Sequence, residues 1–135
     1  MISFQKFGSE LIERVKEIYA AEGWTAYLQD DEKLIRAYDN SLYTLGAFDD
    51  GKLIGLVRCV GDGEHIVVVQ DLIVDRKYQK QGIGTKLFQL AWYNYVNVRM
   101  FQVNTDLEDE VDNHFYQSMG MKPLAEGHMI SYYRC

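Results

Sequence analysis

The stretch that decides the fold is Val74-Asp75-Arg76-Lys77-Tyr78-Gln79-Lys80-Gln81-Gly82-Ile83-Gly84-Thr85-Lys86-Leu87. Before it, residues 65–74 form an apolar run rich in β-branched side chains, which predicts a buried strand. After it, apolar residues recur at helical spacing, which predicts a helix over residues 82–96. The first N–H groups of a helix lack internal partners, and the helix dipole favours negative charge there. A glycine loop between a strand and a helix therefore predicts a phosphate site.

Two other phosphate-binding motifs do not match this stretch. The dinucleotide fingerprint needs a third glycine, but Leu87 stands at that position. The P-loop needs Gly-Lys-Ser/Thr after a four-residue gap from an earlier glycine, and the sequence has no such spacing. What remains is Gln79-x-x-Gly82-x-Gly84 directly after a strand.

This pattern resembles the acetyl-CoA pyrophosphate loop of the GNAT family of N-acetyltransferases. A second segment, Phe115-Tyr116-Gln117-Ser118-Met119-Gly120-Met121, resembles the Tyr-x-x-x-Gly-Phe element of that family, with Met121 in the Phe place. Both segments occur in the family order. The resemblance extends over nearly the whole chain, more loosely toward the N-terminus, and implies one N-acetyltransferase domain over residues 1–135.

Length and composition narrow the class of protein. The chain has 135 residues, of which 47% are hydrophobic, so it suits one folded domain. A net charge of −6 argues against non-specific nucleic-acid binding. It is compatible with a cationic acceptor or simply with solubility. Two cysteines favour a reducing compartment without a structural disulfide. The sequence has no run of membrane-spanning length and no signal peptide, so we expect a cytoplasmic protein.

Hydrophobic patterning predicts an α+β protein with helices on both faces of one sheet. Strands are expected over residues 2–7, 42–48, 53–60, 65–74, 100–104 and 129–133, and helices over 9–22, 30–39, 82–96 and 108–119. The total is six or seven strands and about four helices. The resemblance implies the GNAT fold, a mixed but mostly antiparallel sheet that is splayed open beside the strand ending at Val74.

The resemblance also assigns the cofactor site. The pyrophosphate loop would comprise Gln79, Lys80, Gln81, Gly82, Ile83, Gly84 and Thr85, and the pantetheine arm would pair like a strand with Leu72, Ile73 and Val74. Asp109 occupies a place at which the family often has an asparagine that touches this arm. The family often has proline at the Arg76 position and glycine at the Lys80 position. Neither departure removes a backbone donor.

Two residues are candidates for catalysis by resemblance. Tyr116 occupies the place of a tyrosine that often protonates the leaving CoA thiolate, a role that suits a phenol with a pKa of about 10. The alternative is a half-buried aromatic ring at the core edge. Asp71 lies on the central strand, where some relatives carry a general base, and the alternative is a structural carboxylate at a strand irregularity. Asp109 and Asp112 share a helix face with Tyr116, either to select an amine or as favourable acids at a helix N-terminus.

The resulting prediction is transfer of an acetyl group from acetyl-CoA to a primary amine of a small molecule or peptide by direct attack. The alternative is a non-catalytic acyl-CoA-binding regulatory module. A protein-interaction domain without a ligand would leave the glycine pattern unexplained. We expect no metal, because the three histidines lack metal-ligand spacing. A homodimer paired through the C-terminal strand is also expected.

Overall fold

The computed structural model describes residues 1–134. They fall into two compact units, an N-terminal unit over Met1–Val103 and a C-terminal unit that begins at Asn104. The prediction of one domain over residues 1–135 is not tested by this division.

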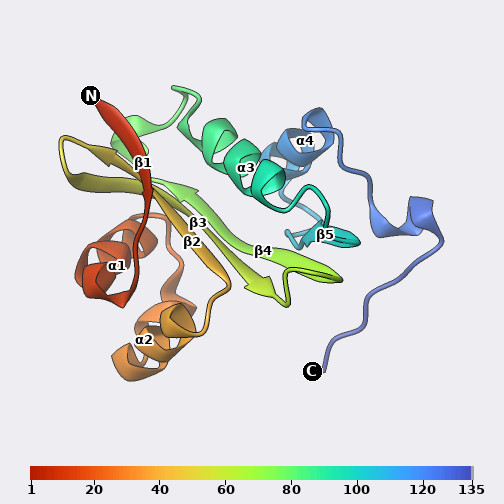
Figure 1. Ribbon diagram of the computed structural model, residues 1–135, viewed down its shortest axis with the longest axis horizontal. Coiled ribbons are helices and arrows are strands. Elements are labelled where there is room, and N and C mark those ends of the chain that lie inside the picture. Colours follow the sequence, from red (N-terminus) through yellow and green to blue (C-terminus); the bar gives the residue numbers. More distant parts are fainter. Residues whose placement is uncertain (135) are drawn as a thin grey trace. The chain divides into compact units, whose positions relative to one another are not determined.

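The N-terminal unit is built on one five-stranded sheet in the order β1-β2-β3-β4-β5 (Figure 1). The strands are β1 (Ile2–Lys6), β2 (Tyr43–Asp49), β3 (Lys52–Gly61), β4 (Ile66–Val74) and β5 (Met100–Val103). Neighbouring strands are antiparallel except β4 and β5, which are parallel. The β2–β3 hairpin turns through Asp50 and Gly51, both at positive φ, as the Asp-Gly sequence predicts.

Helices cover both faces of this sheet, as predicted. Helices α1 (Ile12–Ala21) and α2 (Asp31–Asp39) lie on one face, and α3 (Ile83–Asn94) lies on the other (Figure 1). The core beneath α1 and α2 is a continuous apolar cluster that includes Val15, Ile18, Leu34, Phe48, Leu53, Leu56 and Ile73. On α3 the buried side chains recur at helical spacing and are Ile83, Leu87, Phe88 and Ala91.

A β-bulge in β4 switches which face its side chains occupy. Val69 is opposite Cys59 and Asp71 is opposite Arg58, so Gln70 has no partner residue on β3. Because cross-strand partners share a face, Val69 and Asp71 point to opposite faces despite being two residues apart. Asp71 therefore faces α1 and α2.

The start of the first helix differs from the prediction. The sequence predicts a helix from Ser9, but residues Ser9–Leu11 form a 3₁₀ turn before α1, and the Ser9 hydroxyl donates to Asp39 (2.7 Å) instead of capping the helix. The second helix begins close to the predicted residue 30, since Asp30 caps α2 and its side chain accepts from the N–H of Lys33.

The C-terminal unit contains α4 (Glu110–Ser118) and a 3₁₀ turn over Leu124–Gly127. The predicted strand over residues 129–133 is wrong, because the described part of this segment is not in a strand. Apolar patterning alone does not make a strand, which also needs an edge that supplies hydrogen bonds. The sheet therefore has five strands among the described residues instead of six or seven. The homodimer stays a prediction, without the strand on which it was based.

Candidate cofactor and active site

The second half of β4 has one open edge in the N-terminal unit. β5 pairs with β4 only from Ile66 to Val69, and within residues 1–134 no strand pairs with this edge beyond that point. The N–H of Asp75 donates to the carbonyl of Ile54 (2.8 Å). Since main-chain groups alternate sides along a strand, those of Leu72 and Val74 face away from β3, toward the open edge. This open edge lies beside Val74, where the resemblance predicts the splay of the sheet.

The loop from β4 to α3 has the geometry of an anion site. Gly82 precedes α3 at φ +82°, and a Cβ added there would meet no atom within 4 Å. No side chain caps this helix start. The first N–H to bond back is that of Lys86, to the carbonyl of Gly82 (3.0 Å). The N–H groups of Ile83, Gly84 and Thr85 therefore have no acceptor within the helix.

The backbone at Lys80 has a conformation that suits the glycine often found at this position in the family. Its φ is +65°, a left-handed conformation that costs a residue with a Cβ about 1–2 kcal/mol and that glycine adopts freely. The glycine that the family often has at this place fits the observed backbone. Gly84 differs from Gly82, since its φ is not positive and a Cβ there would make ordinary van der Waals contact with a methyl group of Val74, at 3.6 Å. Neither the space nor the backbone conformation at this position requires glycine.

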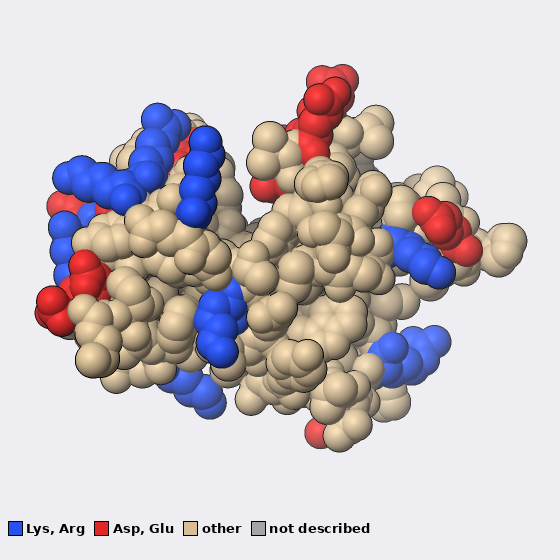
Figure 2. Space-filling view, turned by 90° about the horizontal axis from the view of Figure 1, so that it is seen from above, with Lys and Arg blue, Asp and Glu red and all other residues tan. Residues whose placement is uncertain are grey.

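Basic side chains surround the loop. Arg76, Lys77, Lys80 and Lys86 are all exposed. On the face seen in Figure 2, Lys and Arg side chains gather at the left, the side on which the β4–α3 loop lies in Figure 1. Gln79 is exposed as well, but its side chain bonds to the protein at two places. The amide nitrogen of Gln79 donates to the carbonyl of Val74 (2.9 Å) and to Glu22 (2.8 Å), so this exposed side chain joins the loop to the end of β4 and to the end of α1.

Asp71 is the centre of a buried polar network on the α1 side of the sheet. It is 2% exposed, and its Oδ2 accepts from the Nε of Arg58 (2.6 Å) and the hydroxyl of Tyr19 (2.8 Å). Its Oδ1 accepts from the hydroxyl of Tyr27 (2.7 Å). The Tyr19 hydroxyl also lies 2.6 Å from that of Tyr38.

The charges in this network depend on one another. Burial disfavours the charged guanidinium, but the neighbouring Asp71 outweighs burial and raises the pKa of Arg58. Burial and the Asp71 charge also raise the pKa values of Tyr19 and Tyr27, which keeps both phenols protonated. Three donors on one carboxylate favour the structural role that the sequence left open for Asp71. Its role as general base stays a prediction.

Sequence reasoning missed Arg58 and Tyr19. A signal was present, because Arg58 interrupts the apolar run Leu56-Val57-Arg58-Cys59-Val60 of a strand. A charge inside such a strand requires a buried partner of opposite charge. The partner could not be chosen from sequence, since regular alternation does not place Asp71 on the face of Arg58 without the bulge.

The remaining site candidates lie in the C-terminal unit. Tyr116 is half-buried, and burial together with Asp112 and Asp109 raises its pKa. Asp109 is the N-cap of α4, where its side chain accepts from the N–H of Asp112 (2.9 Å). The helix thus begins at Glu110, two residues later than predicted. This geometry supports the helix-terminus explanation for the acids, and the cofactor contact of Asp109 stays a prediction.

Three further observations concern possible metal ligands, membrane-spanning helices and the free cysteine. Among residues 1–134, no group of three His, Cys, Asp or Glu side chains is arranged to hold a metal ion. In the same part of the chain, no helix combines the length and apolar character needed to cross a membrane. Cys59 is a free, buried thiol, and burial raises its pKa to about 12, which leaves it inert as a nucleophile at neutral pH.

Comparison with known proteins agrees with this geometry. The model of the acetyltransferase (GNAT) family matches residues 11–121. A GNAT-family acetyltransferase from Streptococcus pneumoniae TIGR4 is 36% identical, with a TM-score of 0.86, over 100% of this chain and 98% of that one. A search of curated proteins found no match.

Two more distant structures share the fold. PaiA N-acetyltransferase from Thermoplasma acidophilum, solved in complex with coenzyme A, is 22% identical over 90% of each chain, with a TM-score of 0.74. Ribosomal-protein-alanine N-acetyltransferase from Brucella melitensis biovar Abortus 2308 is 16% identical over 100% of this chain and 99% of that one, also with a TM-score of 0.74. The matched family model spans most of the chain and includes the glycine loop, and therefore the chain belongs to the GNAT acetyltransferase family.

Proposed function

We propose that the protein transfers the acetyl group of acetyl-CoA to a primary amine of a small molecule or peptide. The observation that carries the proposal is the junction of the open β4 edge with an uncapped helix start. The two features lie end to end along residues 72–85. A pyrophosphate at the N–H groups of Ile83 to Thr85 would leave the pantetheine arm to run along Leu72 and Val74.

The open edge supports binding of the pantetheine arm in an extended conformation. The main-chain groups of Leu72 and Val74 would pair with the amides of the arm as with an added strand. The carbonyl of Val74 already accepts from Gln79, so one acceptor on this edge is shared. A backbone N–H on the same edge would polarise the thioester carbonyl as negative charge develops on its oxygen.

The chemical step in this proposal is direct attack by the neutral amine. The nitrogen forms a bond to the acetyl carbon, the carbon–sulfur bond breaks, and CoA leaves as a thiolate. Tyr116 would protonate this thiolate, because a phenol is protonated at neutral pH and can donate as the thiolate forms; burial and the nearby Asp112 and Asp109 raise the pKa of Tyr116 and so make it a weaker acid than an exposed tyrosine. Water would accept the proton that the amine loses, because the Asp71 carboxylate already accepts three hydrogen bonds. Positioning of both reactants would supply much of the rate.

Binding of CoA to Gly82→Ala, measured by calorimetry, tests the cofactor half of the proposal. The new Cβ would stand in open space where the pyrophosphate approaches. Loss of one hydrogen bond to a charged group is worth about 1.5–3 kcal/mol, so we expect affinity to fall by about tenfold to a hundredfold. Gly51→Ala is the matched control, since Gly51 has φ +89° and similarly open space around its Cβ position. Equal affinity of both variants for CoA would refute the assignment.

Release of free thiol from acetyl-CoA, screened against amines, amino acids and peptides, tests the catalytic half. Thiol release that depends on an amine supports transfer. Tight CoA binding without amine-dependent release from any acceptor would instead indicate a regulatory acyl-CoA-binding module.

A further inference from the structure

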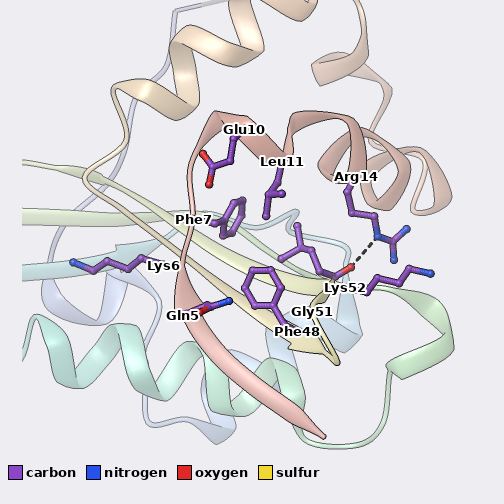
Figure 3. Close-up of a pocket in the computed structure, with 10 residues that line it drawn as sticks. Gln5, Lys6, Phe7, Glu10, Leu11, Arg14, Phe48, Gly51 and Lys52 are labelled. Atoms are coloured by element: carbon purple, nitrogen blue, oxygen red, sulfur yellow. Dashed lines mark hydrogen bonds between the residues drawn. The ribbon is translucent and has the colours of Figure 1, made fainter.

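Helix α1 and the residue that follows it, Glu22, each contact the β4–α3 loop. The contact from α1 itself is made by Arg14. Its Nε donates to the carbonyl of Leu53 (2.8 Å), and its Nη2 donates to the Oδ2 of Asp75 (2.6 Å). Figure 3 shows Arg14 beside a hollow lined by Phe7, Leu11 and Phe48, with the bond to the Leu53 carbonyl dashed. The guanidinium thus joins α1, the start of β3 and the first residue of the loop.

Asp75 connects Arg14 to the backbone of the loop. Its other carboxylate oxygen accepts from the N–H of Lys77 (3.0 Å), which shapes the 3₁₀ turn over Arg76–Tyr78. Its own N–H donates to the carbonyl of Ile54 (2.8 Å). Burial alone would raise the pKa of Asp75, but the Lys77 N–H and the Arg14 guanidinium together lower it. The Asp75 carboxylate is therefore charged at neutral pH.

The second contact is made by Glu22, directly after α1. It accepts from the amide of Gln79 (2.8 Å) and from the Nε of Arg76 (3.2 Å). The Arg76 side chain is 67% exposed, so water screens that pair. The side chains of Arg14 and Asp75 are only 20% and 16% exposed, so their pair is screened less and fixes the loop more firmly.

We infer that Arg14 is a positioning residue for the cofactor, acting through Asp75 on the N–H groups that would hold the pyrophosphate. This inference rests on the proposed function. Apparent affinity falls in proportion to the fraction of molecules whose loop has the binding conformation. The Arg14–Asp75 pair keeps that fraction near one. Without the pair, the loop would keep its glycines and its helix start but would occupy the binding conformation only part of the time.

The test compares two acetyl donors, acetyl-CoA with its pyrophosphate and acetyl-pantetheine without one. Arg14→Met removes the guanidinium and keeps an apolar stem of similar length. We expect it to weaken CoA binding by about tenfold, the result of a loop that is competent in one molecule out of ten. The kcat/KM for acetyl-pantetheine, which lacks the pyrophosphate and relies on the β4 edge, should stay within about twofold of wild type. At saturating acetyl-CoA, kcat should also stay within about twofold, so the loss appears in KM.

Lys16→Met is the matched control on the same helix. Lys16 pairs with Asp31 (2.8 Å) and Glu13 (3.4 Å) and has a side-chain exposure of 24%, close to that of Arg14, but it has no bond to the loop. Its CoA affinity should equal that of wild type. Arg14→Lys should bind CoA more tightly than Arg14→Met but less tightly than wild type, because lysine keeps the positive charge and lacks the planar set of guanidinium donors.

The possible results distinguish a failure of the positioning role of Arg14 from a failure of the proposed function. Unchanged CoA affinity in Arg14→Met, or an equal loss with both donors, would overturn the positioning role. If Arg14→Met does not fold, Asp75→Asn replaces it, because the amide oxygen still accepts from Lys77 while the charge is removed. The same tenfold loss for CoA alone is then expected. If wild type binds no CoA, the proposed function fails, and that failure is visible before any variant is compared.

Discussion

Replacing Asp71 by Asn should destabilise the protein by about 3–5 kcal/mol, the usual loss when one partner of a buried ion pair is removed. Arg58 is 4% exposed, so it cannot turn to water when the carboxylate is lost. The Asn side chain keeps one oxygen, whereas the network needs acceptors for Arg58, Tyr19 and Tyr27. At least one donor would therefore be left unsatisfied at a cost of about 1–3 kcal/mol, and the loss of the charge partner of Arg58 adds to this cost.

Urea unfolding followed by circular dichroism measures this loss, and a double-mutant cycle shows its source. Arg58→Met should also destabilise the protein, because it leaves the Asp71 charge buried without its partner. The double variant should cost less than the sum of the singles by roughly 2–3 kcal/mol. A loss below about 1 kcal/mol for Asp71→Asn, or simple additivity, would refute the description of Asp71 as the centre of a buried network.

The same variant separates a structural carboxylate from a general base. A base would contribute about a hundredfold or more to kcat and would appear as a group in the pH profile of kcat/KM. Tyr19→Phe is the matched control, because it removes one hydrogen bond to Asp71 and leaves the carboxylate. For a structural carboxylate, Asp71→Asn and Tyr19→Phe should both leave the pH profile unchanged when measured well below their melting temperatures. Loss of the basic group from the profile of Asp71→Asn alone would show that Asp71 is the base.

Three further predictions concern other parts of the chain. Lys80→Gly should stabilise the protein by about 0.5–1 kcal/mol in urea unfolding, since it relieves the left-handed strain at φ +65°, whereas Lys77→Gly, at a residue without positive φ, should destabilise it. Asp62 accepts from the N–H groups of Glu64, His65 and Ile66, which lower its pKa to about 2. The stabilisation from that carboxylate is present above the ordinary pKa of 3.8 and is lost as pH falls toward 2, so the difference in melting temperature between wild type and Asp62→Asn should shrink over this window; a constant difference would contradict the assignment. Tyr116→Phe should lower kcat by about a hundredfold with near-normal CoA affinity, and less for a donor whose leaving thiol is more acidic; wild-type turnover when chemistry limits the rate would show that the tyrosine is structural.

Local signals account for the parts of the fold that could be predicted from the sequence. The Asp50–Gly51 turn, the Gly82 helix start and the helical spacing after Ile83 each depend on residues close together in the chain, and the structure has all three. The bounds of the predicted elements differ mainly where a side chain finds a partner outside its own segment. Ser9 is one such case, since it bonds to Asp39 instead of capping a helix.

Features that depend on long-range pairing could not be predicted. The apolar residues 129–133 have strand-like composition, but composition does not say whether a sheet edge is available to them. The Asp71 network joins four segments of the chain through Tyr19, Tyr27, Arg58 and the bulged strand. The polar pair Gln70-Asp71 within the apolar strand is compatible with the strand irregularity considered for Asp71, but the sequence does not show which residue is left unpaired.

The inserted residue in β4 lies between the two halves of the candidate site in the N-terminal unit. Pairing between β4 and β5 ends at Val69, the residue before unpaired Gln70. β5 itself ends at Val103, opposite Val69, so among residues 1–134 no strand pairs with the edge at Leu72 and Val74 that follows the bulge. The same extra residue reverses the alternation of side chains, so Asp71 meets Arg58 inside the protein instead of facing α3. The buried ion pair therefore depends on the bulge, and a change that restored regular pairing would separate Asp71 from Arg58.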